Sequence, residues 1–347
     1  MKRLLSGLAA IAFALAAPLP AHADRTPDDL RELSRTLRVH IGSAVDATAL
    51  AGEADYRRVL NQEFNHVTAE NAMKWETVEP QRGAYDWEAA DAVVENARRN
   101  RQQVRGHTLV WHNQLPAWLI EGVDSGAIDA KELRKILRSH IMTEVGRYRG
   151  KIRAWDVVNE VVDDTGKLRD SIWLKHLGPG YIADAFRWAH QADPRARLYI
   201  NDYNLEWDAK KIETTLGIVK DLKAKRVPIH GIGFQGHLGI QYDYPGDFAG
   251  VMRRFTDLGL EAAITEADVR MVMPATAEKL ATQADYYQRM LSTCVANKRC
   301  VEFTVWGFTD RHSWVPDWFE GEGAANIMDE NLAHKPAYDA LLAVRRK

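Results

Sequence analysis

Two apolar, strand-like segments that lie far apart in the chain each deliver a glutamate at or near their carboxyl end. Ala154–Val158 is followed by Asn159 and Glu160, and Ala262–Asp268 carries Glu266. Apolar strands of this kind are typical of a parallel sheet, and in an α/β barrel their carboxyl ends share one face. Two carboxyl groups on that face have the chemistry that cleaves a glycosidic bond.

The two glutamates need different protonation states for that reaction. One stays protonated and gives its proton to the leaving oxygen, whereas the other is ionised and attacks the anomeric carbon. We assign Glu160 as the acid/base and Glu266 as the nucleophile. A single glutamate at a strand end is more often a structural cap, so this prediction depends on both residues lying across one barrel mouth.

A second group of polar residues is expected to support Glu266. Because side chains alternate along a strand, Glu266 and Asp268 face the same way, as do Gln235 and His237 on the preceding strand. A hydrogen-bonded chain from Glu266 through His237 to Asp268 would keep Glu266 ionised and oriented. The alternative for His237 is a histidine that is satisfied within the core.

Further polar and aromatic residues near the same strand ends are candidates for holding a sugar. Asn159, next to the acid, is placed to bind the 2-hydroxyl of the ring, a contact that strengthens in the transition state. The candidates for other hydroxyls are Glu70, Asn71, Lys74, His107 and Gln235. Trp111, Trp306 and Trp314 have flat rings that suit the apolar face of a sugar, although core packing is the common role of a tryptophan.

Strand-like and helical segments alternate along the whole chain, which is typical of an α/β fold with a parallel sheet. The expected strands are Val39–Val45, Val67–Asn71, Val104–His112, Ala154–Glu160, Leu198–Asn204, Gly231–Leu238, Ala262–Asp268 and Val301–Phe308. The expected helices include Trp87–Arg99, Lys131–Tyr148, Tyr181–Gln191, Lys210–Lys223, Glu278–Val295 and Ala337–Arg346. These units predict a single (β/α)8 TIM barrel, with a doubly wound sheet as the structural alternative.

Polar residues recur at the carboxyl ends of these strands. Asn201, Asp202 and Asn204, for example, end the expected strand Leu198–Asn204. Buried strands tolerate polar groups only when these groups are paired or functional. Their repetition at one end favours a functional face.

The first residues predict an export signal. Two basic residues precede the apolar run Leu4–Ala17, and Ala21-His22-Ala23 offers a small-residue cleavage site. We therefore expect residues 1–23 to be removed as a signal peptide and residues 24–347 to form one catalytic domain, either extracellular or periplasmic. An uncleaved anchor is the alternative, which prolines after the run disfavour.

The overall charge argues against two classes of partner. The formal net charge is −2 and like charges form no block, which disfavours a surface for nucleic acid or an anionic membrane. We expect no membrane association after signal cleavage, because no later segment has the apolar length of a membrane span. We expect the protein to be a monomer.

Cys294 and Cys300 are the two cysteines of the chain. Export permits a disulfide, and Ala296-Asn297-Lys298 supplies a turn between them. We predict that they are bridged, with two free thiols as the alternative. So short a loop would stabilise by less than the roughly 3 kcal/mol that is typical of longer ones.

Two patterns that suggest cofactors are rejected. The segment 231–236 has the G-x-G-x-x-G spacing of a dinucleotide site, but it lies inside an expected strand and no helix follows it. His107 and His112 would face opposite sides of a strand, and the chain has no H-E-x-x-H motif. We expect no cofactor and no catalytic metal.

Seven blocks of sequence, in order, resemble family 10 of the glycoside hydrolases, which are retaining endo-β-1,4-xylanases on a (β/α)8 barrel. The blocks are Thr68–Trp75, Arg105–His112, Trp155–Glu160, Asn201–Asn204, Gly231–His237, Ile264–Glu266 and Thr304–Asp310. The resemblance extends from Leu37 to Tyr338. It implies hydrolysis of xylan and xylo-oligosaccharides by double displacement through a covalent glycosyl-enzyme.

The resemblance also implies roles for individual residues. Glu160 matches the acid/base and Glu266 the nucleophile, with His237 and Asp268 in support. The positions that match sugar-binding residues are Glu70, Asn71, Lys74, His107, Trp111, Asn159, Gln235, Trp306 and Trp314. The segment Asp317–Met328 is less typical of the family.

Two other functions remain open from the sequence. The same barrel serves a β-1,4-glucanase or an enzyme that acts on both glucan and xylan. A polysaccharide-binding protein without turnover is the alternative in another class, and the presence of both glutamates argues against it.

Overall fold

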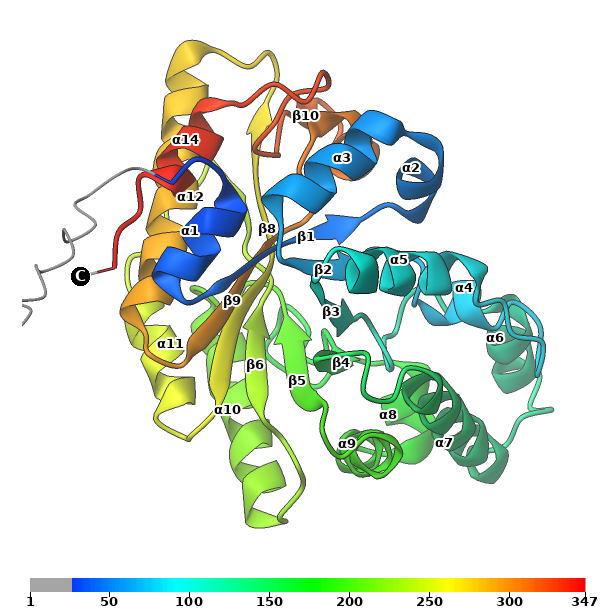
Figure 1. Ribbon diagram of the computed structural model, residues 1–347. Helices are drawn as coiled ribbons and strands as arrows, with labels where there is room; N and C mark the ends of the chain where they lie inside the picture. Colours follow the sequence, from blue (N-terminus) through cyan, green and yellow to red (C-terminus); the bar gives the residue numbers. More distant parts are fainter. Residues whose placement is uncertain (1–26, 347) are drawn as a thin grey trace, which may run out of the picture.

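Eight parallel strands close into a barrel in the computed structural model of the protein, which describes residues 27–346 (Figure 1). They are β1 (His40–Val45), β2 (His66–Ala69), β3 (Gln103–Gly106), β4 (Ala154–Asn159), β5 (Arg197–Asp202), β6 (Gly231–Phe234), β8 (Glu261–Val272) and β9 (Cys300–Val305). Strand β9 pairs with both β1 and β8, which closes the ring. The predicted TIM barrel is confirmed.

Strand β8 continues past the barrel and builds part of its rim. It runs for 12 residues, and its second half pairs in parallel with β7 (His237–Gly239). At its end it pairs antiparallel with β10 (Glu322–Gly323). Glu266 and Asp268 therefore lie where the barrel passes into this small additional sheet.

Helices fill the connections between the strands. They are α1 (Leu30–Leu37), α2 (Ala47–Gly52), α3 (Ala54–Glu63), α4 (Trp75–Val78), α5 (Glu88–Arg99), α6 (Ala117–Asp124), α7 (Ala130–Arg147), α8 (Ile172–Leu177), α9 (Gly180–Ala192), α10 (Ala209–Ala224), α11 (Phe248–Thr256), α12 (Ala277–Ala296), α13 (Val315–Trp318) and α14 (Pro336–Leu342), with the short 3₁₀ helix η1 (Asp310–His312). Helices α1, α12 and α14 lie beside one another, so both ends of the described chain cover the same side of the barrel (Figure 1).

Helix α12 illustrates why these segments become helices. Thr276 caps its start by accepting a hydrogen bond from the backbone N–H of Lys279. Its buried residues recur at intervals of three and four and face the barrel: Gln283, Ala284, Tyr287, Met290, Leu291 and Cys294. The same spacing predicts this helix from the sequence. Helices α3 and α11, which were not among the named expectations, are shorter amphipathic helices of the same kind.

One expected strand ends earlier than its apolar run. The run Val104–His112 leaves the ladder after Gly106, and a loop follows. The expectation that His107 and His112 face opposite sides of one strand is therefore wrong. The backbone N–H of Leu109 in this loop donates to the carbonyl of Asp156, so the loop stays close to β4.

A second expected strand, Gly231–Leu238, is divided into β6 and β7. Gly236, between them, has a φ of +79°, a conformation that favours glycine. Its backbone N–H donates to the buried carboxylate of Glu206 at 2.7 Å instead of joining the ladder. The break lets Gln235 and His237 approach Glu160 and Glu266, respectively, from separate backbone segments.

Charged side chains, rather than aliphatic layers alone, fill part of the barrel interior. Arg105 of β3 is fully buried and donates through Nε and Nη2 to the carboxylate of Glu302, at 2.9 and 3.0 Å. Its Nη1 donates to Asp156 at 2.6 Å. Burial acts to raise the pKa of Glu302, but the Arg105 charge outweighs it and holds that pKa well below its usual range. Bidentate, charge-assisted hydrogen bonds offset the desolvation of these groups.

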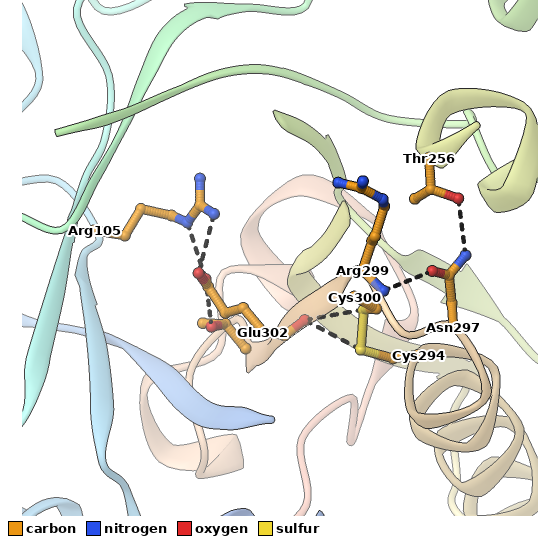
Figure 2. The surroundings of a disulfide bond; sticks show 8 residues. Arg105, Thr256, Cys294, Asn297, Arg299, Cys300 and Glu302 are labelled. Carbon is orange, nitrogen blue, oxygen red and sulfur yellow. Dashed lines mark hydrogen bonds and ion pairs between the residues drawn. A yellow bond between two sulfur atoms is a disulfide. The ribbon is translucent and has the colours of Figure 1, made fainter. Parts of the chain in front are cut away.

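The predicted disulfide between Cys294 and Cys300 is present and joins the end of α12 to the start of β9. Figure 2 shows that Glu302 lies between this bridge and Arg105. The backbone carbonyl of Glu302 is directed at the two sulfur atoms, and its carboxylate is directed at the guanidinium. The bridge therefore sits next to the buried ion pair.

The predicted signal peptide, residues 1–23, lies outside the described residues, and the division at residue 23 stays a prediction. Within residues 27–346, none of the helices combines the length and the hydropathy that a bilayer span requires.

Candidate active site

A continuous hydrogen-bond network joins Glu160, which follows β4, to Glu266 in β8. Gln235 donates through Nε2 to Glu160 Oε1 at 3.1 Å and to Asn159 Oδ1 at 3.3 Å. Asn201 donates through Nδ2 to the same Asn159 oxygen at 3.0 Å and to Glu266 Oε1 at 2.7 Å. The carboxyl ends of β4, β5, β6 and β8 thus bring both glutamates to one face, as the sequence predicts.

Glu266 is almost completely buried among polar partners. Its Oε2 lies 3.1 Å from His237 Nε2, and its Oε1 lies 4.0 Å from His107 Nδ1 in addition to the Asn201 amide. Burial alone would raise the pKa of Glu266, but the hydrogen bond from His237 and the nearby His107 imidazole outweigh it and lower that pKa below its usual value. Glu266 is therefore ionised at neutral pH.

His237 connects Glu266 to Asp268. Its Nδ1 lies 2.8 Å from Asp268 Oδ2, which also accepts a hydrogen bond from Trp314 Nε1 at 2.8 Å. Burial acts to lower the pKa of His237, but the charge of Asp268 and the two hydrogen bonds outweigh it and raise that pKa to about 10. At neutral pH His237 is an imidazolium that donates to both carboxylates. The structure contains the hydrogen-bonded chain that the sequence predicts.

The side chain of Glu160 meets uncharged donors instead. Trp111 donates through Nε1 to Oε2 at 2.9 Å, and Gln235 donates to Oε1. His112 Nδ1 is 3.9 Å from Oε2, but burial lowers the pKa of His112, so it is neutral at pH 7. The hydrogen-bond donors to the two carboxyl groups therefore differ: an imidazolium donates to Glu266, whereas uncharged groups donate to Glu160.

The backbone at Glu160 is unusual. Its φ of +55° lies in the left-handed region, which residues other than glycine adopt rarely and at some cost in energy. The Glu160 N–H donates to the carbonyl of Asn201 at 2.9 Å, and its own carbonyl accepts from Arg169 Nε at 2.7 Å. These two contacts hold the backbone where the side chain can point into the site.

A group of polar residues after β2 forms one wall of the site. Lys74 donates through Nζ to Asn71 Oδ1 at 2.8 Å and to Gln114 Oε1 at 2.6 Å, and it lies 5.0 Å from the centre of the Trp111 ring. Burial raises the pKa of Glu70 to about 7, with the carboxylates of Asp46 and Glu266 adding to the shift and Lys74 opposing it. The wall offers donors and acceptors for sugar hydroxyls.

The predicted tryptophans contact the histidines of the site. The Trp306 ring meets His107 edge to face with ring centres 5.2 Å apart, and it meets His237 in the same way at 6.3 Å. Trp314 meets His237 edge to face at 5.0 Å. The structure therefore brings all the predicted site residues together, and His107 itself is anchored through Nδ1 to Asp156 at 3.0 Å.

Sequence reasoning did not assign four of the residues that complete the site. The polar residues at the end of its strand pointed to Asn201 as a candidate. Its position depends on Gly233, because a Cβ at residue 233 would come within 2.1 Å of the Asn201 amide oxygen. Gln114 and Asp156 act through partners 40 and 51 residues away in the chain, and Arg169 acts through the Glu160 carbonyl, which is nine residues away. Nothing in their local sequence indicates those partners.

The part of the chain that the structure describes contains no group of three or more His, Cys, Asp or Glu side chains that could hold a metal ion.

The chain matches the family model described as glycosyl hydrolase family 10 over residues 29–344. This chain belongs to glycosyl hydrolase family 10. Among family 10 relatives, an endo-1,4-beta-xylanase of Agaricus bisporus is 44% identical over 310 residues, which are 89% of this chain and 91% of the relative. Endo-1,4-beta-xylanase B of Thermotoga neapolitana is 43% identical, with 90% of each chain covered.

Solved structures of the family superpose closely on this one. Native xylanase 10B from Thermotoga maritima has a TM-score of 0.86 at 42% identity, covering 90% of this chain and 96% of that one. Xylanase 10B from Thermotoga petrophila, solved in complex with xylobiose, has a TM-score of 0.87 at 40% identity, covering 92% and 98%.

Proposed function

We propose that the protein is an endo-1,4-β-xylanase that cleaves internal β-1,4 bonds of xylan with net retention of anomeric configuration. The observation that carries this proposal is the contrast between the two glutamates. Glu266 is held ionised by the His237 imidazolium and Asn201, whereas Glu160 has uncharged donors, Trp111 and Gln235. A retaining glycosidase needs one carboxylate that attacks and one carboxylic acid that gives a proton. Relatives named as endo-1,4-beta-xylanases support the choice of xylan.

In the first step Glu266 forms a bond to the anomeric carbon while the glycosidic C–O bond breaks. Glu160 gives its proton to the departing oxygen, so the leaving sugar departs as a neutral alcohol and Glu160 becomes a carboxylate. His237 remains protonated and orients the attacking oxygen of Glu266. The product is a covalent glycosyl-enzyme on Glu266.

In the second step the ionised Glu160 takes a proton from water. The water oxygen bonds to the anomeric carbon, and the bond to Glu266 breaks. Both carboxyl groups then have their original protonation states. Two inversions at one carbon give net retention.

The remaining site residues hold the sugar. Asn159, fixed through its Oδ1 by Asn201 and Gln235, is placed next to the acid for the 2-hydroxyl. The other proposed sugar contacts are Glu70, Asn71, Lys74, His107, Gln235, Trp111, Trp306 and Trp314.

Trp306 is proposed to crowd the position that the hydroxymethyl group of a glucose unit would need. Replacing it with alanine should raise turnover of cello-oligosaccharides relative to that of matched xylo-oligosaccharides. The ratio of the two kcat/KM values measures this effect. An unchanged ratio would remove Trp306 from that role, and a wild-type preference for cello-oligosaccharides would favour a glucanase instead.

We also propose that the protein is exported after removal of residues 1–23 and acts as a monomer outside the cytoplasm. N-terminal sequencing of the secreted protein and its sedimentation velocity test the two parts of this proposal.

The experiment that tests catalysis is the Glu266→Ala variant. It should lose turnover of xylohexaose by several orders of magnitude and still bind xylohexaose in a calorimetric titration, because the sugar contacts stay in place. Glu213→Ala, on the outer helix α10, is the matched control and should keep full turnover. Persistent turnover in Glu266→Ala would contradict the assignment, and a wild-type protein that binds without turnover would identify a binding protein.

A further inference from the structure

Glu206 is a buried acidic residue that takes no part in the two chemical steps. It lies in the loop after β5, and its side chain accepts a hydrogen bond through Oε1 from the backbone N–H of Gly236 at 2.7 Å. Gly236 lies between Gln235 and His237, which contact the two glutamates of the site. Glu206 therefore holds the backbone one residue away from a partner of each glutamate.

A turn after β5 directs Glu206 into the protein. Asn204 has a φ of +59°, and its carbonyl accepts hydrogen bonds from the backbone N–H groups of Trp207 and Asp208 at 3.3 and 2.9 Å. Leu205 and Glu206 are buried, whereas Trp207 is exposed. The turn thus places the Glu206 carboxyl group at the break between β6 and β7.

The hydrogen bond to Glu206 is the short one at this break. The backbone N–H of Asp268 reaches the Gly236 carbonyl at 3.4 Å, which is a long contact. Gly236 also packs closely on β8, since a Cβ there would lie 3.1 Å from Ile264 Cγ2. Without Glu206 the Gly236 N–H would lose its acceptor, and the backbone of residues 235–237 would be free to shift toward another one.

The geometry of the site is sensitive to such a shift. Gln235 Nε2 lies 3.1 Å from Glu160 Oε1, and His237 Nε2 lies 3.1 Å from Glu266 Oε2. A displacement of about half an ångström would stretch either contact beyond an ordinary hydrogen bond. Both glutamates would then lose a donor that orients them.

The acceptor role of Glu206 does not require a charge. Burial raises the pKa of Glu206, whereas hydrogen bonds from its own backbone N–H and from Gly236 oppose the shift. A carboxyl oxygen accepts the Gly236 N–H whether or not a proton is bound to the other oxygen. A glutamine at this position therefore offers the same acceptor.

We propose that Glu206 is a positioning residue for the two glutamates that act on the sugar. By holding the Gly236 N–H, it fixes Gln235 and His237, the two residues that donate to those glutamates. This inference rests on the proposed function, because it assigns Glu206 a part in that reaction. Glu206 acts through the backbone of residues 235–237 and not on the sugar itself.

The test compares Glu206→Ala with Glu206→Gln in the full exported enzyme, with xylohexaose as the substrate. Glu206→Ala should lower kcat and kcat/KM by the same factor, roughly 10- to 100-fold, because a misplacement of about 1 Å has an effect of that size and the sugar contacts themselves remain. Glu206→Gln, which keeps an acceptor for Gly236, should restore most of the turnover.

Glu63 of α3 provides the matched control. Its carboxyl group is buried as well, and it accepts hydrogen bonds from the backbone N–H of Leu30 at 3.2 Å and from the Tyr338 hydroxyl at 2.7 Å, outside the candidate active site. Glu63→Ala should therefore lower the midpoint of urea unfolding, as Glu206→Ala does, but leave kcat unchanged.

Proton NMR gives a readout that needs no substrate. The two ring N–H protons of His237, which are hydrogen-bonded to Asp268 and Glu266, should resonate far downfield. Their absence from the spectrum of His237→Asn identifies them. Glu206→Ala should shift or broaden these signals, whereas Glu206→Gln and Glu63→Ala should leave them in place.

Other outcomes would overturn the inference. Wild-type kinetics and unchanged His237 signals in Glu206→Ala would show that Glu206 positions nothing in the site. Equal losses in Glu206→Ala and Glu206→Gln would exclude the acceptor role, and an equal fall of kcat in Glu63→Ala would attribute the loss to any buried carboxyl group. A wild-type enzyme that cleaves no xylohexaose would contradict the proposed function, and the His237 signals would still decide whether Glu206 positions His237.

Discussion

The protonation state of His237 is set by opposing effects of its surroundings, and the protonated form in turn keeps Glu266 ionised. Burial favours the neutral imidazole, whereas Asp268 and Glu266 favour the imidazolium, and the carboxylates prevail. The alternation of side chains along β8 explains why Glu266 and Asp268 share a face, whereas the position of His237 depends on the break in the backbone at Gly236. Asn201 was not predictable in the same way, because its approach to Glu266 depends on the missing side chain at Gly233 on the next strand.

Replacing His237 with asparagine should lower kcat roughly 10- to 100-fold, because a hydrogen bond to a charged group contributes about 1.5–3 kcal/mol. The reaction profile with pH gives a second readout. In the wild type the imidazolium persists throughout the neutral range, because the pKa of His237 is about 10, so the factor by which His237→Asn lowers kcat should stay constant across neutral pH.

Unfolding in urea tests whether His237 is protonated in the folded protein. Because the pKa of His237 is raised from 6.5 when the protein folds, its contribution to stability is complete below pH 6.5 and is lost as the pH rises to about 10. The difference in the free energy of unfolding between wild type and His237→Asn should shrink over that interval. His176→Asn, at the end of α8, is the control. A difference that does not change with pH would contradict the charged state.

At the scale of the elements, the sequence predicts where the barrel strands lie but not where each strand ends. Apolar runs locate all eight barrel strands, because strands buried on both faces need them. The runs then continue into loops, as after Gly106, where backbone groups bond to neighbouring strands instead of extending the ladder. Gly236 and Glu160, which adopt positive φ, mark places where tertiary contacts decide the conformation.

Strand β3 depends on the ion pairs of Arg105. Arg105→Met keeps much of the volume but leaves Asp156 and Glu302 as uncompensated buried carboxylates, which should cost about 3–5 kcal/mol of stability at neutral pH. Removing Arg105 should also let the pKa of Glu302 rise, so the loss should diminish as the pH falls and the carboxylates take up protons.

Urea unfolding at neutral and acidic pH measures this loss. Arg98→Met, which breaks an exposed pair with Glu95 on α5, is the matched control and should change stability little. If Arg105→Met were as stable as Arg98→Met, the ion pairs of Arg105 with Asp156 and Glu302 would not contribute to stability as proposed.

At the scale of the whole molecule, the barrel collects polar residues from distant segments into its mouth and interior, and other buried titratable groups lie outside this cluster. Glu144 of α7 is completely buried with its carboxyl group 3.3 Å from His140 Nε2, and the His140 ring stacks on Trp75 at 3.6 Å. Burial raises the pKa of Glu144 well above its usual value and lowers that of His140 to about 3. Both groups are therefore neutral when the protein is folded.

Glu144→Gln should stabilise the whole protein at and above neutral pH. The unfolded chain ionises Glu144 above pH 4.5, whereas the folded one does not, so the wild type loses stability as the pH rises. A glutamine has no proton to lose and should raise the melting temperature by a few degrees at pH 8. This increase in melting temperature should vanish near pH 4. An equal increase at pH 8 and at pH 4 would contradict the neutral state of Glu144.

The arrangement of the site makes one central claim: Glu266 attacks the sugar and Glu160 supplies and recovers the proton. Proton NMR spectra recorded in the first minutes of xylo-oligosaccharide hydrolysis test it directly, because the new anomer appears before mutarotation. Net retention predicts that the β-anomer appears first. An α-anomer that appears first would contradict the covalent route and make Glu266 a base that acts through water.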